Sequence, residues 1–271
     1  HERFRRQRQM CIRDSISLSY ETKGQGSDIL LLHGFPSSMY MWNDIKKELV
    51  ENGYRVTILE QRGYPLSRLK NFDLLSFNIE ELSKDVEELI LKLNLDQNLT
   101  IVGHDWGSIV AWAVMSREKV NINKLVSLCG GTEFPVSAVY SNLTYNEKLH
   151  YISSFQNVKE SANIIDSNLE LFFRSAYRMN NQIGDSVDLS LENVFINNLS
   201  ESCVMKENEI INLIQHFDKF SLDQPIAWYA NIDFNSELSS AWRKVVTTPI
   251  HFVFGEVDAA VKLNVKMRER L

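Results

Sequence analysis

The chain has 271 residues, of which 44% are hydrophobic and 24% charged, and its formal net charge is -6. This length suits one large α/β domain, or a core with a smaller insertion, and the composition is ordinary for a globular protein. The acidic balance excludes the basic face of a nucleic-acid-binding protein. No apolar run approaches the roughly 20 residues of a membrane span.

The cysteines indicate a reduced setting. There are three, Cys11, Cys129 and Cys203, and they are unevenly spaced and odd in number. Neither a disulfide framework nor a metal-ligand spacing is visible, so we expect no metal, no cofactor and a cytoplasmic location.

The first fifteen residues differ from the rest. They read HERFRRQRQMCIRDS, with five arginines, no initiator methionine and neither helical nor strand periodicity. A basic arm for an anionic partner is one interpretation, and a cloning or sequence-assembly scar is the one that we favour. We therefore expect residues 1–14 to be a non-native or disordered leader outside the fold.

Strands then alternate with helices. Apolar or alternating runs predict strands at 15–20, 28–32, 55–59, 100–102 and 124–128. Capping residues and apolar spacings of three and four predict helices at 37–50, 77–95 and 106–119. This order predicts a mostly parallel sheet with crossover helices.

The alternation breaks after residue 132. Residues 133–240 are mostly helical in pattern, with connections rich in Asn and Ser, and a strand returns at 249–254. We predict an α/β core in two parts, 15–132 and 241–271, and a helical cap at 133–240 inserted between them.

The strongest local signal is the run Gly103-His104-Asp105-Trp106-Gly107. Here a predicted strand enters a predicted helix, and small residues flank one exposed side chain, which is typical of a nucleophile elbow. The usual occupant is Ser, and this chain has Asp105. Alternatively, the glycines only permit a tight turn and Asp105 caps the helix.

An aspartate at the elbow indicates a particular chemistry. Attack of a carboxylate on an acyl carbon gives an anhydride, which is a poor intermediate. Attack on an sp³ carbon gives an alkyl ester that water can cleave. Asp105 therefore favours epoxides or alkyl halides over carboxylic esters as substrates.

The run His33-Gly34-Phe35-Pro36 ends an earlier core strand. This fold places an oxyanion loop there, so we expect the backbone N–H groups of Phe35 and Trp106 to form the oxyanion hole. A plain turn is the alternative interpretation.

Three runs together resemble the signature of the epoxide hydrolases of the α/β-hydrolase fold: His33 to Pro36, Arg62-Gly63-Tyr64 with Ser67, and Gly103 to Gly107. The resemblance covers nearly everything from residue 15 to the end. It implies an α/β-hydrolase fold with a cap, and conversion of an epoxide to a vicinal diol through a covalent ester on Asp105. The partners implied are a small-molecule epoxide and water.

Two positions depart from the family pattern. Glu60 stands where the family usually has Asp, and Pro65 where it usually has Gly. Both lie on a predicted structural loop, so we expect them to affect packing more than chemistry.

Two tyrosines of the predicted cap bear on the choice of substrate. Tyr151, in residues 150–156, and Tyr229, in residues 225–229, stand in segments that resemble the family's cap-tyrosine segments. Phenols are protonated at neutral pH and can donate to the alkoxide of an opening epoxide, whereas halide departure needs no proton. The resemblance implies that both contact the substrate, with Phe35 and Trp106. Helix packing is the alternative role.

A dehalogenase is the second candidate. The indole N–H of Trp106 can bind a halide, but family dehalogenases usually carry an amide or acid where this chain has Phe35. Relatives that act on fluoroacetate usually carry Arg in place of Trp106.

The resemblance also implies a charge-relay acid at Asp258, with Glu256 as the weaker alternative. The histidine that it would orient should follow it, and the six histidines all precede it. We therefore expect a fragment that ends before the last strand and helix. A non-catalytic, ligand-binding member of the fold is the alternative hypothesis.

Overall fold

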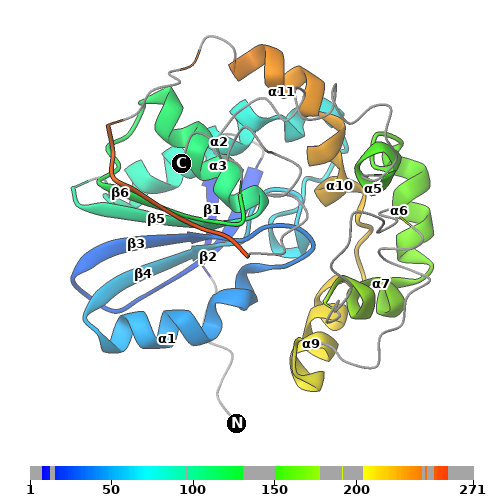
Figure 1. Ribbon diagram of the computed structural model, residues 1–271, viewed down its shortest axis with the longest axis horizontal. Helices are drawn as coiled ribbons and strands as arrows, with labels where there is room; N and C mark the ends of the chain where they lie inside the picture. Colours follow the sequence, from blue (N-terminus) through cyan, green and yellow to red (C-terminus); the bar gives the residue numbers. More distant parts are fainter. Residues whose placement is uncertain are drawn as a thin grey trace.

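The centre of the computed structural model is a seven-stranded sheet with the strand order β1-β2-β4-β3-β5-β6-β7 (Figure 1). The structure describes residues 8–12, 16–95, 97–130, 150–177, 191, 204–239, 242 and 247–255. The strands are β1 (Arg8–Ile12), β2 (Ile16–Lys23), β3 (Ser27–Leu32), β4 (Tyr54–Leu59), β5 (Leu99–His104), β6 (Lys124–Leu128) and β7 (Ile250–Val253). Pairing is parallel from β4 through β7, and β1 and β2 are antiparallel additions. The predicted fold class, a mostly parallel sheet, is confirmed.

Strand β1 corrects one expectation. Residues 8–12 pair antiparallel with β2, so the prediction that the leader lies outside the fold is wrong for these five residues. An edge strand is held by backbone hydrogen bonds to one neighbour, and it needs no alternation of buried and exposed side chains. That residues 1–14 are non-native stays a prediction.

Helices cover both faces of the sheet. The helix α1 (Asn43–Glu51) lies on one face, and α2 (Ile79–Leu93) and α3 (Trp106–Arg117) lie on the other (Figure 1). Alternate side chains of β3 therefore enter two different cores, with Ile29 and Leu31 on the α1 side and Leu30 and Leu32 opposite. The predicted helices are present, and 3₁₀ turns flank them at η1 (Met39–Trp42), η2 (Pro65–Ser67) and η3 (Leu74–Phe77).

Between β6 and β7 the described chain is helical. The elements are α5 (His150–Ser154), α6 (Val158–Asp166), α7 (Leu169–Ala176), α9 (Glu207–Phe217), α10 (Asp223–Ala230) and α11 (Ile232–Ser239). In Figure 1, α5, α6, α7 and α9 stand apart from the sheet, with α10 between them and the core. The boundaries predicted at 133 and 240 fall outside the described residues and stay predictions.

The loop after β4 is hydrogen-bonded to α10. The Gln224 side chain donates to the Leu69 carbonyl and accepts from the Leu69 N–H, each at 2.9 Å. The Trp228 indole donates to the Arg62 carbonyl at 3.2 Å. These bonds fix α10 against the core, and with it Tyr229, which follows Trp228.

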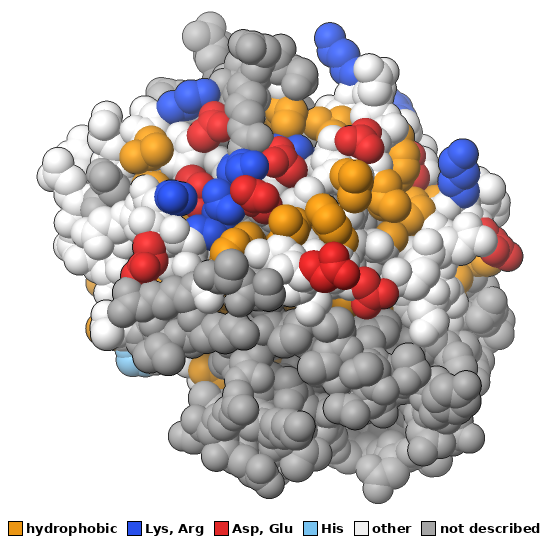
Figure 2. Space-filling model, turned by 90° about the horizontal axis from the view of Figure 1, so that it is seen from above, with side chains coloured by type: hydrophobic (Ala, Val, Ile, Leu, Met, Phe, Trp, Pro, Cys, Tyr) orange, Lys and Arg blue, Asp and Glu red, His pale blue; other side chains and the backbone are white. Residues whose placement is uncertain are grey.

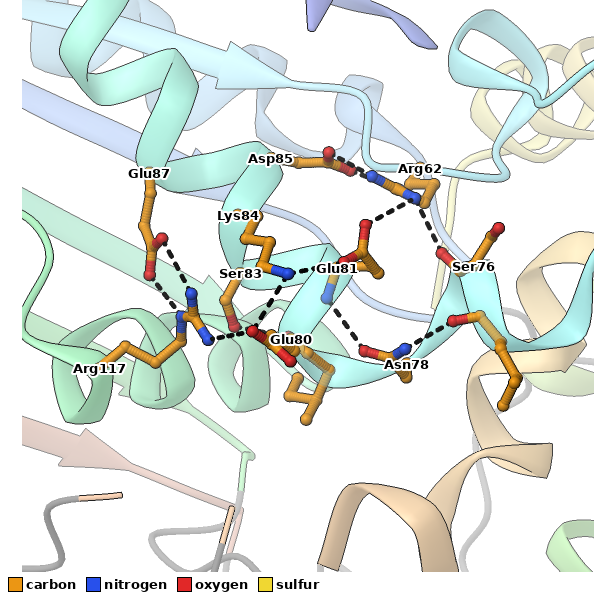
Figure 3. Close-up of polar contacts among 12 residues, drawn as sticks. Arg62, Ser76, Asn78, Glu80, Glu81, Ser83, Lys84, Asp85, Glu87 and Arg117 are labelled. Atoms are coloured by element: carbon orange, nitrogen blue, oxygen red, sulfur yellow. Dashed lines mark hydrogen bonds and ion pairs between the residues drawn. The ribbon is translucent and has the colours of Figure 1, made fainter. Parts of the chain in front are cut away.

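That loop is itself anchored by a buried ion pair (Figure 3). The Arg62 guanidinium, 1% exposed, binds the Asp85 carboxylate of α2, with Nε 2.6 Å from Oδ2. It also donates to the Ser76 carbonyl at 2.9 Å. A buried charge is tolerated only where it is paired and hydrogen-bonded, so these partners hold the loop in place.

Charged side chains of α2 and α3 pair with each other, partly buried and partly at the surface. Arg117 lies 2.7 Å from Glu87 and 3.2 Å from Glu80, and Lys84 lies 3.1 Å from Glu80 (Figure 3). Figure 2 views the molecule from above, where α11, α2 and α3 lie in Figure 1, and basic and acidic side chains are interspersed there. Over the described residues, no helix is long and apolar enough to cross a membrane.

The Arg62–Asp85 pair yields a stability prediction. Asp85→Ala removes both short bonds to the buried Arg62 guanidinium and leaves the Glu81 carboxylate 3.8 Å away, so we expect a loss of about 3–5 kcal/mol in the free energy of unfolding. Lys92→Ala is the control, because Lys92 makes an exposed pair with Glu88 that should contribute about 0.5 kcal/mol or less. Urea unfolding of both variants measures the difference. Equal losses would show that the buried pair does not anchor the loop.

Candidate active site

The elbow between β5 and α3 holds Asp105 in an unusual backbone conformation. Its φ is 53° and its ψ is −122°, which non-glycine residues rarely adopt, and such strain costs about 1–3 kcal/mol. A Cβ on Gly103 would overlap the Gly107 backbone, so the strand and helix approach too closely for larger residues. The Asp105 side chain makes no helix-capping hydrogen bond, and the alternative role of a cap is therefore wrong.

One oxygen of the Asp105 carboxylate already lies in the predicted oxyanion site. The backbone N–H of Phe35 donates to Asp105 Oδ1 at 2.8 Å. A Cβ on Gly34 would overlap the Asp105 side chain, which explains the glycine before Phe35. Trp106 is the first residue of α3, where a backbone N–H has no acceptor within the helix. Its role as the second donor stays a prediction.

His33 and Tyr64 aim the Phe35 N–H. The Gly34 carbonyl lies 3.1 Å from His33 Nδ1 and 3.4 Å from the Tyr64 hydroxyl. In a planar trans peptide the carbonyl and the next N–H point in opposite directions. Holding the Gly34 carbonyl on one side therefore turns the Phe35 N–H toward Asp105.

The contacts of its ring define the protonation state of His33. Its Nε2 accepts from the Gln61 N–H at 3.1 Å, and its Nδ1 faces a carbonyl that can only accept. The ring is therefore neutral, with its proton on Nδ1. Complete burial lowers the pKa of His33, which agrees with this assignment. His33 positions the Phe35 N–H through the Gly34 carbonyl and has no free nitrogen with which to act as a base.

Both predicted cap tyrosines lie at this site. The Tyr229 ring is 5.1 Å from the Trp106 ring, 5.4 Å from Phe35 and 6.3 Å from Tyr151. Burial, and then the Asp105 charge, raise the pKa of Tyr229 well above 10, against the effect of a hydrogen bond with the Trp106 side chain. The Tyr229 phenol therefore stays protonated at neutral pH and can donate.

Two further aromatic residues enclose the site, and the sequence analysis did not select them. Phe155 and Phe172 are fully buried, and their rings lie 5.5 and 6.0 Å from Phe35. Phe155 also lies 5.0 Å from Tyr229. The four-residue spacing of Tyr151 and Phe155 is the signal that could have identified Phe155. These rings surround Phe35 and Tyr229 with apolar side chains, and electrostatic interactions are stronger in such surroundings.

The remaining predicted residues are not brought to the site by the described structure. Asp258 and Glu256 lie outside the described residues, as does the side chain of His150. His216 lies on α9, and its Nε2 is 2.6 Å from Oε1 of Glu60, on the loop that follows β4.

Glu60 is a buried junction between core and cap. Its second oxygen accepts from the Met39 N–H at 2.9 Å, and its carboxylate is fully buried. Burial alone would raise the pKa of Glu60, but the hydrogen bond and charge of His216 outweigh it and hold the pKa below the usual 4.5. Glu60 stands where the family usually has Asp. These contacts agree with the expectation that this difference affects packing more than chemistry.

Comparison with known proteins agrees with this fold. Residues 29–208 match the model of the alpha/beta hydrolase fold, which is more than half of the chain, so the chain belongs to this family. A solved structure of a Vigna radiata epoxide hydrolase mutant shares the fold, with a TM-score of 0.84 at 22% identity, covering 97% of this chain and 84% of that chain.

Two curated relatives carry epoxide hydrolase names. Bifunctional epoxide hydrolase 2 of Sus scrofa is 25% identical over 239 residues, which cover 83% of this chain and 42% of that protein. Epoxide hydrolase 1 of Caenorhabditis elegans is 27% identical over 251 residues, which cover 88% of this chain and 56% of that protein. The chain thus spans about half the length of these relatives.

The Glu60–His216 contact yields a pH prediction. A carboxyl whose pKa is lower in the folded chain stabilises the fold above its unfolded pKa, and this contribution is lost as pH falls through the folded value. Glu60→Gln should therefore lower the free energy of unfolding most near neutral pH, and the deficit should shrink below about pH 4.5. Urea unfolding of both proteins across this range measures it. A deficit that does not change with pH would contradict the prediction.

Proposed function

We propose that the chain converts an epoxide to a vicinal diol through a covalent ester on Asp105. The observation that carries the proposal is a strained carboxylate with one oxygen on the Phe35 N–H, beside the paired aromatic rings of Tyr151 and Tyr229. The names of the curated relatives support the same chemistry. The partners proposed are a small-molecule epoxide and water.

The first step is alkylation. The Asp105 oxygen that does not bind the Phe35 N–H attacks an epoxide carbon, forming one C–O bond as the ring C–O bond breaks. The electron pair of the broken bond goes to the epoxide oxygen, to which the phenols of Tyr151 and Tyr229 donate hydrogen bonds and a proton. This step needs no general base.

The second step is hydrolysis of the ester. Water adds to the Asp105 ester carbonyl, and the resulting oxyanion forms on the oxygen that already binds the Phe35 N–H. Collapse of this intermediate breaks the ester C–O bond, releases the diol and regenerates the carboxylate, and the proton taken from the water returns to the tyrosinate. A base must take the proton of the attacking water, and we propose that Asp258 orients a histidine for that purpose, as in related hydrolases.

An alkyl halide is the second substrate class that an aspartate nucleophile can attack. The rings of Tyr151 and Tyr229 lie together beside Trp106, and two phenols that can donate favour the epoxide, because halide departure needs no proton. A cytoplasmic setting is proposed on the few, unpatterned cysteines.

Covalent capture tests the nucleophile. Incubation of the folded 271-residue chain with styrene oxide should add one substrate mass, located on the peptide that contains Asp105, because alkylation needs only residues of this site. Asp105→Ala should gain no mass at that peptide. Intact-mass and peptide mass spectrometry measure both. Equal labelling of the variant, or binding of styrene oxide to the wild-type chain without any ester, would overturn the proposal.

The tyrosines have a separate prediction. Tyr151→Phe or Tyr229→Phe should slow the mass gain by about 10²-fold, which is typical of losing a well-placed acid, and the double variant should be slower still. Phenethyl bromide is the control substrate, because its leaving group needs no proton. If the double variant gains mass from styrene oxide at the wild-type rate, the dehalogenase would be favoured. The same holds if the wild-type chain reacts faster with phenethyl bromide than with styrene oxide.

A further inference from the structure

Gln156 joins the two segments that carry the cap tyrosines. Its Nε2 donates to the Tyr229 carbonyl at 3.0 Å and to the Ile152 carbonyl at 3.2 Å. Ile152 follows Tyr151 in α5, and Tyr229 is in α10. One side-chain amide therefore bridges the backbones of two segments that are 73 residues apart in sequence at this contact.

We propose that Gln156 is a positioning residue that sets the relative placement of the Tyr151 and Tyr229 phenols. The inference rests on the proposed function, because it concerns how two phenols come to share one epoxide oxygen. Gln156 itself touches neither the nucleophile nor the reacting atoms.

The chemistry of the side chain suits this role. A primary amide nitrogen carries two hydrogens, and here two carbonyls accept from that nitrogen, one from each tyrosine segment. Glu has the same length but only accepts when ionised, so it would place a negative charge against both carbonyl oxygens. Gln156 can therefore hold the segments together where its nearest isostere would drive them apart.

The position of each phenol relative to the core depends on this bridge. Helix α10 is fixed to the core by the two bonds of Gln224 to Leu69 and by the bond of Trp228 to Arg62. Helix α5 has five residues, and a helix this short has little stability of its own. Gln156 ties α5 to the fixed helix, and the buried Phe155 ring packs against both Tyr151 and Tyr229, at 5.6 and 5.0 Å.

The Tyr151 and Tyr229 hydroxyls can donate to one epoxide oxygen at the same time only if the distance between them is right. Two hydroxyls that donate to one oxygen must each lie about 2.5–3.0 Å from it. A displacement of about 1 Å in a reacting group can cost up to about 10² in rate. A shift of α5 relative to α10 would therefore weaken epoxide activation without removing either phenol.

The test compares two glutamines of the cap. Gln156→Glu breaks the bridge, and Gln215→Glu makes the same change on α9, at an exposed residue for which the described structure shows no hydrogen bond to α5 or α10. Gln156 is itself exposed, so both variants should fold, which urea unfolding checks. With styrene oxide, we expect the limiting rate of mass gain to fall about tenfold for Gln156→Glu, with an unchanged half-saturating concentration, and to be unchanged for Gln215→Glu.

A double-mutant cycle identifies the route of the effect. If Gln156 acts through the phenols, Gln156→Glu should slow the reaction about tenfold in the wild type and about twofold or less in a chain that carries both Tyr151→Phe and Tyr229→Phe. An equal slowing in both backgrounds, or equal rates for the Gln156 and Gln215 variants, would overturn the positioning role. If the wild-type chain forms no ester, the proposed function fails. An ester formed at the same rate by Gln156→Glu overturns only this inference.

Discussion

The hydrogen bond from the Phe35 N–H to Asp105 Oδ1 is the contact on which the rest of the site depends. It can form only because Asp105 adopts a positive φ at the end of β5 and because Gly34 leaves room for the aspartate side chain. The direction of the Phe35 N–H is set by the other end of the same peptide group, because His33 and Tyr64 hold the Gly34 carbonyl. The strain at Asp105 is therefore compensated by a network that also directs the Phe35 N–H toward its carboxylate.

The cap depends on the core in a similar way. The buried Arg62–Asp85 pair fixes the loop after β4 to α2. The same loop holds α10 through Gln224 and Trp228. Helix α10 brings the Tyr229 ring to Phe35 and Trp106, and Trp106 follows Asp105 in the chain. A buried ion pair adds little stability compared with an apolar pair, but it permits only one geometry. That property suits a loop on which a phenol must be placed relative to a carboxylate on another strand.

The elements and the elbow at Asp105 could be predicted from the sequence because their signals are local. The apolar run of β3, the spacing in α2 and the glycines beside Asp105 each lie within a few residues. Strand β1 was missed because an edge strand needs no apolar pattern. The bridge by Gln156 and the link from Glu60 to His216 could not be predicted, because each joins residues more than 70 positions apart and exists only once cap and core are packed.

In the proposed mechanism, the placement of the Phe35 N–H would affect both chemical steps. Before reaction it binds one carboxylate oxygen, so the other would be the attacking atom, and it also stabilises the ground-state charge, which weakens a carboxylate as a nucleophile. After alkylation the bound oxygen is the ester carbonyl oxygen, and it becomes the oxyanion when water adds. The donor therefore acts against the first step and in favour of the second. Activation of the epoxide by paired phenols compensates for this, since proton donation assists alkylation alone. The placement of Tyr151 and Tyr229 should thus determine the rate of the first step, and the oxyanion loop should determine the rate of the second.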